Sequence, residues 1–281
     1  MIEPIGLALG SGSARGLAHV GVLKVLEKNH IPISHIAGSS IGAVFGAHYC
    51  AFRSAEKLEK LVFDISEKKL FQFLDITIRG GLIKGVKIEA LLTDVFKETQ
   101  FSDLVIPFAA VATDLSNGSK VVFKSGNLIP AIRASISVPA LLQPVQFKEK
   151  VLGDGGLSDP IPVDVVRKLG ATKVVAVNLD TFVNKPFKKT FAPLSRVPLN
   201  SINILRHNLA LATVTTTPFI ISPLIQSEFY AWRDFFNPLK VKEYIAEGER
   251  AANTIVPALL TSSLPIQTRQ TLLQKLLSYI R

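Results

Sequence analysis

The sequence contains a single cysteine, Cys50, among its 281 residues. One thiol cannot form a disulfide within the chain, and so low a cysteine content is typical of a reducing compartment. The first residues lack the basic segment and the apolar stretch of a secretory signal. We therefore expect a cytoplasmic protein.

Long apolar runs are absent as well. The two least charged stretches, 36–52 and 208–227, are interrupted by Gly, His, Pro, Thr and Ser. A membrane-spanning helix needs about 20 consecutive apolar residues. Neither stretch is expected to cross a membrane, so the protein should be soluble or peripheral at a membrane surface.

Dense runs of basic residues are also missing, although the net charge is +10. No Cys/His set has zinc-finger spacing and no aromatic RNA-binding signature is present, which argues against a nucleic-acid partner. The charge instead favours peripheral contact with an anionic membrane surface. Lys185, Lys188 and Lys189 flank Phe187 in a segment suited to such contact, and a basic surface loop explains them equally well.

Short apolar runs alternate with helical patterns at the start of the chain. The first run extends from Ile5 to Leu9, and the second from Ile33 to Ala37. Between them a helical pattern begins near Leu17, with Ser13 as its expected N-cap. A strand–helix–strand unit of this kind is nearly always a right-handed parallel crossover.

Later segments continue the alternation, with strands expected at Val105–Leu115, Val121–Lys124 and Lys173–Leu179 and a helix at Val163–Lys168. The pattern predicts an α/β fold with three layers, α/β/α, around a mostly parallel central sheet. Sites in such sheets form beyond the carboxyl ends of strands. We expect one domain over residues 1–281, in which a C-terminal helical region, 181–281, completes or covers the site.

The second apolar run leads into the pattern G-x-S-x-G, formed by Gly38, Ser40 and Gly42. A serine on a sharp turn between a strand and a helix exposes its hydroxyl above the sheet, and the glycines avoid crowding in that turn. The helix that follows directs free N–H groups towards a developing oxyanion. A Gly/Ser turn that merely caps a helix gives the same pattern.

A glycine-serine loop, 10–16, follows the first apolar run. Its glycines resemble a dinucleotide-binding fingerprint, but that site needs a charged residue at the end of the second strand, and 37–40 offers none. An oxyanion hole explains the small residues better, because they let backbone N–H groups approach a substrate oxygen. The N–H groups expected to form this hole belong to Ser11, Gly12, Ser13 and Ile41. Arg15 either shapes the loop or is a solvated helix residue.

A nucleophilic serine needs a group that accepts its proton. Among the five histidines only His207 follows an acidic loop, as a Ser-Asp-His order requires, but its surroundings read as an ordinary helix. Asp154 is delivered by a short apolar run into the glycine-rich turn with Gly155 and Gly156. An aspartate with an ordinary pKa is a poor base, so this pairing requires partial desolvation of Asp154.

Taken in this order, the motifs resemble those of the patatin-like phospholipase family, and most closely its small bacterial members. The likeness covers roughly residues 5–180 and includes Ala112-Thr113-Asp114-Leu115, Ser135-Ile136-Ser137-Val138-Pro139 and Pro160-Ile161-Pro162-Val163. The resemblance implies a Ser40–Asp154 dyad without a catalytic histidine, an acyl-serine intermediate, and hydrolysis of acyl esters in phospholipids or lysophospholipids. It implies no metal or cofactor. The supporting residues would be Gly10, Arg15, Gly16, Gly38, Gly42, Gly155 and Gly156.

The chain departs from the family pattern at two positions, because Ser11 and Ser13 occupy the places of the first two loop glycines. If these positions need a positive φ, each serine costs about 1 to 2 kcal/mol. A non-catalytic regulatory or lipid-binding protein that keeps the fold is the competing interpretation.

The last hundred residues carry weaker signals. Leu272, Leu273, Leu276, Leu277 and Ile280 share one helical face, which is expected to pack on the domain itself rather than on lipid or a partner. Composition alone suggests an aromatic lid or acyl channel from Pro218, Pro223, Phe229, Tyr230, Trp232 and Phe235.

Overall fold

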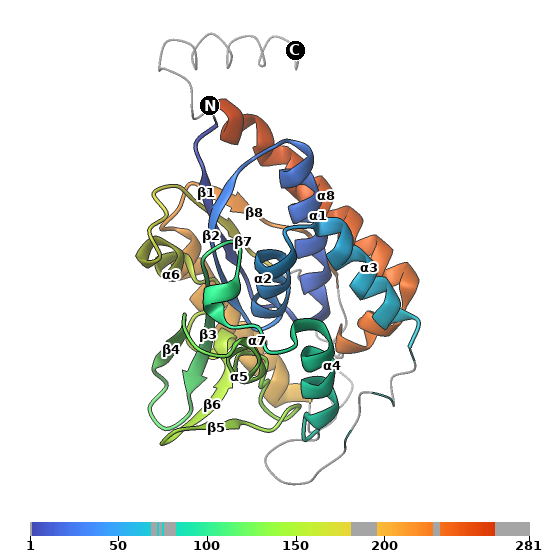
Figure 1. Ribbon diagram of the computed structural model, residues 1–281, viewed down its shortest axis with the longest axis vertical. Coiled ribbons are helices and arrows are strands. Elements are labelled where there is room, and N and C mark those ends of the chain that lie inside the picture. Colours follow the sequence, from blue (N-terminus) through green and yellow to red (C-terminus); the bar gives the residue numbers. More distant parts are fainter. Residues whose placement is uncertain are drawn as a thin grey trace.

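The computed structural model describes residues 2–68, 72, 75, 83–180, 196–226 and 231–261. Within them a central sheet has the strand order β5-β6-β3-β2-β1-β7-β8, with β4 paired to β3 (Figure 1). The strands are β1 (Ile5–Leu9), β2 (Ile33–Ser39), β3 (Phe108–Asp114), β4 (Lys120–Phe123), β5 (Val145–Phe147), β6 (Lys150–Asp154), β7 (Val174–Val177) and β8 (Phe219–Ile221).

The centre of the sheet is parallel. Strand β1 pairs in parallel with β2 and β7, β2 with β3, and β7 with β8, whereas β4 and β6 run antiparallel to β3. All five residues of β1 are buried, which is typical of a parallel strand covered on both faces. The predicted three-layer fold with a mostly parallel sheet is therefore confirmed.

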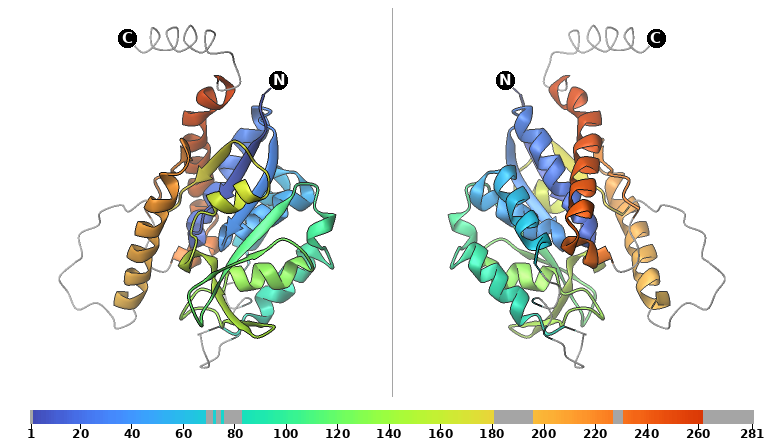
Figure 2. Two further views of the ribbon diagram at one scale, coloured as in Figure 1. Left: turned by 90° about the vertical axis from the view of Figure 1, so that its left-hand side faces the viewer. Right: turned by 90° about the vertical axis from the view of Figure 1, so that its right-hand side faces the viewer.

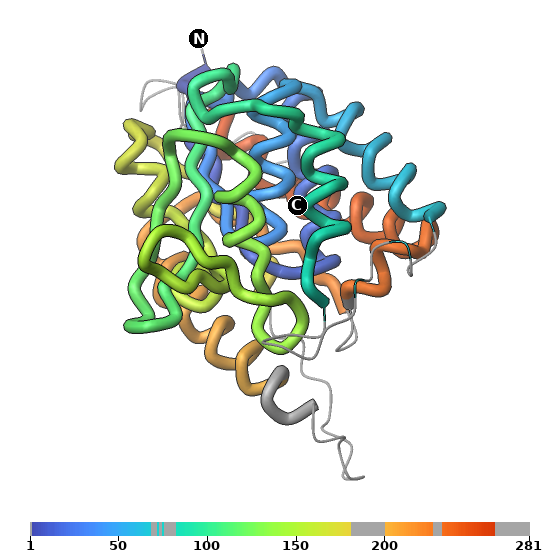
Figure 3. The backbone as a smooth tube through the Cα atoms, turned by 60° about the horizontal axis from the view of Figure 1, so that its bottom comes forward, coloured from blue at the N-terminus to red at the C-terminus, as the bar shows by residue number. Residues whose placement is uncertain are grey.

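Helices cover both faces of the sheet, as Figure 2 shows from two sides. The helices are α1 (Ala18–Lys28), α2 (Ile41–Phe52), α3 (Ala55–Ser66), α4 (Val86–Phe96), α5 (Leu128–Ser135), α6 (Val163–Lys168), α7 (Arg196–Val214) and α8 (Pro238–Thr261). Figure 3 shows α3 at one margin of the molecule, away from strands β4 to β6.

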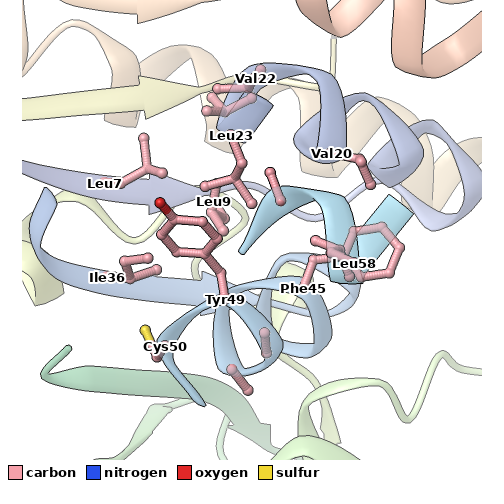
Figure 4. Packing of buried hydrophobic residues seen from close by; sticks show 14 of the residues in the cluster. Leu7, Leu9, Val20, Val22, Leu23, Ile36, Phe45, Tyr49, Cys50 and Leu58 are labelled. Atoms are coloured by element: carbon pink, nitrogen blue, oxygen red, sulfur yellow. The ribbon is translucent and has the colours of Figure 1, made fainter. Parts of the chain in front are cut away.

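The alternation of side chains along β1 divides the core in two. Leu7 and Leu9 face a large cluster with α1, α2, α3, α5 and α8, part of which is drawn in Figure 4. Ala8 faces the opposite way, into a smaller cluster with α6 and α7. This two-residue period is the one expected for a strand buried between two layers.

Most predicted elements form close to their expected positions, and helix α6 has the predicted bounds. The strand expected from Val105 begins later, at Phe108. The prediction of Ser13 as an N-cap is wrong. Ser13 is the first residue of a 3-10 turn, η1 (Ser13–Leu17), which continues into α1 without a side-chain cap. Its φ of 53° is far from the extended conformation of a capping serine.

The C-terminal region is described in part. Its helix α7 contacts the turn η4 (Gly155–Leu157), and α8 packs along α1. No helix of the described ranges is long and apolar enough to cross a membrane. The basic segment around Phe187, the leucine-rich face from Leu272 to Ile280, and the aromatic residues Phe229 and Tyr230 lie outside the described residues.

Candidate active site

The sheet register brings the ends of β2 and β6 together. On one edge of β3, Val111 pairs with Ser39 and the next residue, Ala112, pairs with Asp154. The other edge of both residues is occupied by β4. Strands β2 and β6 therefore meet end to end on the same edge, and the residue after Ser39 lies beside Asp154.

That next residue is Ser40, which stands between β2 and α2 with φ 55° and ψ −124°. This conformation is rare for a residue with a side chain and is typical of strained turns at functional sites. The side chain is buried, and its Oγ donates a hydrogen bond to Asp154 Oδ2 at 2.5 Å. The structure thus joins the two residues that the sequence singled out for nucleophile and base.

The turn around Ser40 has no room for side chains at its glycines. A Cβ on Gly38 would lie 2.2 Å from the Gly42 carbonyl oxygen, and one on Gly42 would lie 2.2 Å from the Leu9 carbonyl oxygen. Both neighbours are backbone atoms, so the collisions cannot be relieved by a rotamer change. At the other supporting glycines the nearest atom to an added Cβ lies 2.5 Å (Gly10), 2.4 Å (Gly16), 2.1 Å (Gly155) and 2.9 Å (Gly156) away.

Asp154 is the last residue of β6 and is only 4% exposed. Its Oδ1 accepts a hydrogen bond from the Gly156 N–H at 2.8 Å. Burial raises the pKa of its carboxyl to about 6, although the hydrogen bonds from Ser40 and Gly156 act in the opposite direction. The desolvation that a Ser-Asp pairing requires is therefore present.

The peptide between Gly10 and Ser11 is held at both ends. The Gly10 carbonyl accepts a hydrogen bond from Nε2 of the buried His19 at 2.8 Å, and the Ser11 N–H donates to the Pro160 carbonyl at 2.8 Å. The expectation that Ser11 offers its N–H to an oxyanion is therefore not met, because that hydrogen is already bonded.

The other three expected donors stand at helix starts. Gly12 precedes η1, whereas Ser13 and Ile41 are the first residues of η1 and α2, so helix geometry provides no acceptor for these three N–H groups. The Gly12 carbonyl accepts from the backbone N–H of Arg15 at 3.2 Å and from its Nε at 3.3 Å. These bonds fix the peptide that carries the Ser13 N–H.

A buried ion cluster lies next to this loop. Asp180 accepts hydrogen bonds from Arg15 Nη2 at 3.0 Å and from Arg206 Nη2 at 2.7 Å, and Arg206 Nε also bonds to it. Burial raises the pKa of the Asp180 carboxyl, but the two guanidinium groups outweigh it, so its pKa stays below the ordinary value. Arg15 therefore shapes the loop and is not simply a solvated helix residue.

Sequence reasoning missed Asp180 and Arg206. Asp180 follows directly on the predicted strand 173–179, and a charged residue at the carboxyl end of a parallel strand was a usable signal. Arg206 gave no signal, because it sits in the middle of α7 among uncharged residues. Its neighbour His207 bonds through Nδ1 to the Asp180 carbonyl, while the Ser40 hydroxyl donates to Asp154.

Comparisons with known proteins find similar chains by sequence and by structure. The sequence profile of the family described as patatin-like phospholipase matches residues 7–167. The chain is 37% identical over 177 residues to an uncharacterized NTE family protein of Mycobacterium bovis, covering 63% of this chain and 49% of that protein. It is 32% identical over 181 residues to neuropathy target esterase of Drosophila melanogaster, covering 62% of this chain and 13% of that protein.

The chain therefore spans about half the length of the mycobacterial relative and a small part of the fly protein. Among solved structures it is similar to VipD from Legionella pneumophila, with a TM-score of 0.49 and 11% identity over 93% of this chain and 67% of that one.

Proposed function

Because the chain belongs to the patatin-like phospholipase family, we propose that it is a serine acyl hydrolase with Ser40 as nucleophile and Asp154 as general base. The single observation that carries the proposal is the 2.5 Å hydrogen bond from Ser40 Oγ to the buried Asp154 carboxylate. Nucleophile and base already have the contact that proton transfer needs.

The reaction begins when Ser40 Oγ attacks the ester carbonyl and its proton passes to Asp154. The carbonyl oxygen becomes an oxyanion, which the N–H groups of Gly12, Ser13 and Ile41 stabilise. When the tetrahedral intermediate collapses, Asp154 returns the proton to the departing alcohol oxygen. Water then attacks the acyl-Ser40 ester and gives a proton to Asp154. Asp154 passes that proton to Ser40 Oγ as the acyl bond breaks, which releases the fatty acid and restores the free serine.

The environment of Asp154 suits both halves of this cycle. A carboxyl with a pKa of about 6 is ionised at neutral pH and is a stronger base than an ordinary aspartate. As the proton moves onto Asp154, negative charge moves to the oxyanion. The cations Arg15 and Arg206 remain in place nearby, so the buried site keeps positive potential while that charge develops.

We propose phospholipids or lysophospholipids as substrates, on the strength of the family and of an esterase among the relatives. The net charge of +10 supports peripheral contact with an anionic membrane surface, where such substrates reside. We further propose that the C-terminal helices complete the same domain, because Arg206 on α7 bonds to the Asp180 carboxylate.

Release of fatty acid from purified phospholipid and lysophospholipid, measured by mass spectrometry, tests the proposal. The full chain should release fatty acid, and both Ser40→Ala and Asp154→Asn should abolish release. Ser39→Ala is the matched control, since this neighbouring hydroxyl is equally buried and has no hydrogen-bond partner among the described residues. A folded wild-type chain that cleaves no acyl ester would favour the non-catalytic, lipid-binding alternative.

A further inference from the structure

We propose that Ser135, the last residue of α5, is a positioning residue that holds Ser40 in its reactive conformation. The proposal rests on the proposed function of Ser40. Ser135 belongs to the segment 135–139, for which the catalytic cycle described above provides no role.

The hydroxyl of Ser135 bridges the nucleophile and the neighbouring strand. Its Oγ accepts a hydrogen bond from the Ser40 N–H at 2.9 Å and donates to the Val111 carbonyl of β3 at 2.5 Å. The side chain is fully buried. A hydroxyl can accept and donate at the same time, so one atom satisfies two buried backbone groups.

Ser40 needs such a partner because of its backbone conformation. At φ 55° it has left the regular course of β2, and as the residue before α2 it can donate its N–H to no carbonyl of that helix. Strained backbone persists only where the surroundings hold it in place. The bond to Ser135 ties the strained residue to β3, the strand that also pairs with Asp154.

The same end of α5 also holds the base. The Asp154 N–H donates to the Ser137 carbonyl at 2.9 Å. The Ser137 hydroxyl accepts from the buried Arg133 guanidinium at 2.8 Å, and that guanidinium also donates to the carbonyls of Lys84 and Gln143. One short, anchored segment therefore fixes the backbone of both members of the dyad.

This arrangement predicts a specific kinetic defect for Ser135→Ala. Loss of the bridge lets Ser40 relax away from Asp154, and a displacement of about 1 Å in a reacting group costs on the order of 100-fold in rate. We expect kcat for a soluble ester, and the second-order rate of inactivation by a fluorophosphonate, to fall about 100-fold with KM within about twofold of wild type.

Thr217→Val provides the matched control. The Thr217 hydroxyl is also buried and also bridges two backbone groups, donating to the Val174 carbonyl at 2.6 Å and accepting from the Phe219 N–H at 3.4 Å. Val174 pairs with Gly6, at the end of β1 away from the catalytic loops. This variant should lose thermal stability to a similar extent and keep the wild-type rates.

Rates are compared per folded molecule, with folding checked by circular dichroism. Equal rates for Ser135→Ala and wild type would overturn the role of Ser135 while leaving the proposed function intact, whereas an unreactive wild type would overturn both. Ser135→Thr, which keeps the hydroxyl, should recover most of the rate. If Ser135→Ala does not fold, Ser135→Cys replaces it, because a thiol is a weaker hydrogen-bond partner than a hydroxyl. A wild-type rate for Ser135→Cys would then contradict the proposal.

Discussion

At the scale of single residues, the charge state of Asp154 governs the proposed chemistry. Only the ionised carboxylate can accept the Ser40 proton, and burial raises its pKa to about 6. The rate should therefore rise with pH up to about 6, about tenfold per pH unit well below that value, and level off above about 7. The measurement is kcat/KM for a neutral chromogenic ester between pH 4.5 and 8.5. A flat profile across this range would mean that a group with this pKa is not the base.

Arg206 belongs to the C-terminal helical region, and its charge acts on Asp154. Its positive charge lowers the Asp154 pKa, and it also neutralises Asp180, whose negative charge acts in the other direction. Both effects are lost in Arg206→Gln, and each loss favours protonation of Asp154. The acid limb of the pH–rate profile should therefore shift to higher pH by about one pH unit.

Arg206→Lys is the companion variant, because it keeps the charge but loses the two-point bond to Asp180. It should leave the acid limb closer to its wild-type position than Arg206→Gln does. An unchanged profile in Arg206→Gln would show that Arg206 only braces the loop around Arg15.

At the scale of elements, the loop between β1 and η1 carries two serines in different backbone conformations. Ser13 has a φ of 53°, whereas Ser11 does not have a positive φ. A side chain in the left-handed region costs about 1 kcal/mol, and a glycine in an ordinary conformation costs about 0.5 to 1 kcal/mol through the unfolded chain.

Ser13→Gly should therefore leave the free energy of unfolding unchanged or raise it by up to about 1 kcal/mol, while Ser11→Gly should lower it by at least about 0.5 kcal/mol. Ser11→Gly also loses the hydroxyl that lies 3.5 Å from Asp180 Oδ2. Urea unfolding of the two variants beside wild type measures both changes. Equal destabilisation by both glycines would contradict this reading of the loop.

The sequence was most informative about elements whose pattern is local. Strand β1 was predictable because burial on both faces requires a continuous apolar run. Helix α6 was predictable because it is a short amphipathic stretch between turns. The start of η1 was not, since the loop that leads into it is bonded to a distant part of the chain. The bond that occupies the Ser11 N–H comes from Pro160, almost 150 residues along the chain.

At the scale of the whole molecule, α8 packs tightly against α1, the helix that follows η1 and the loop after β1. A Cβ on Gly248 would lie 2.0 Å from the Ala18 carbonyl oxygen, and one on Gly21 would lie 2.0 Å from the Ile245 carbonyl oxygen. The two helices thus touch backbone to backbone near His19, which holds the Gly10 carbonyl. We propose that the C-terminal helices unfold together with the catalytic core as one unit.

The variant Gly248→Val tests whether the C-terminal helices and the core unfold together. The added side chain must push α8 away from α1, so the melting temperature should fall by about 5 °C or more, in a single transition that loses ester hydrolysis and helical signal together. Ala246→Val adds the same side chain at an exposed position of the same helix and should change little. Separate transitions for activity and helicity would contradict a single unit.

The assembly of the site explains which of its residues could be predicted from the sequence and which could not. Ser40 and Asp154 were recognisable because each sits in a glycine-rich turn after an apolar run. Their contact depends on β2 and β6 meeting on one edge of β3, a register that no local pattern encodes. Asp180 lies at the end of the region that the motifs cover and Arg206 lies beyond it, and only the folded chain brings them to Arg15.

The most direct test of the proposed chemistry identifies the side chain that reacts. The native protein is treated with a fluorophosphonate, and the modified residue is located by peptide mass spectrometry. We predict one adduct per chain, on Ser40, with labelling lost in Ser40→Ala, strongly slowed in Asp154→Asn and unchanged in Ser39→Ala. Stoichiometric labelling of another residue, or of none in a folded and otherwise intact protein, would contradict the assignment of Ser40 as the nucleophile.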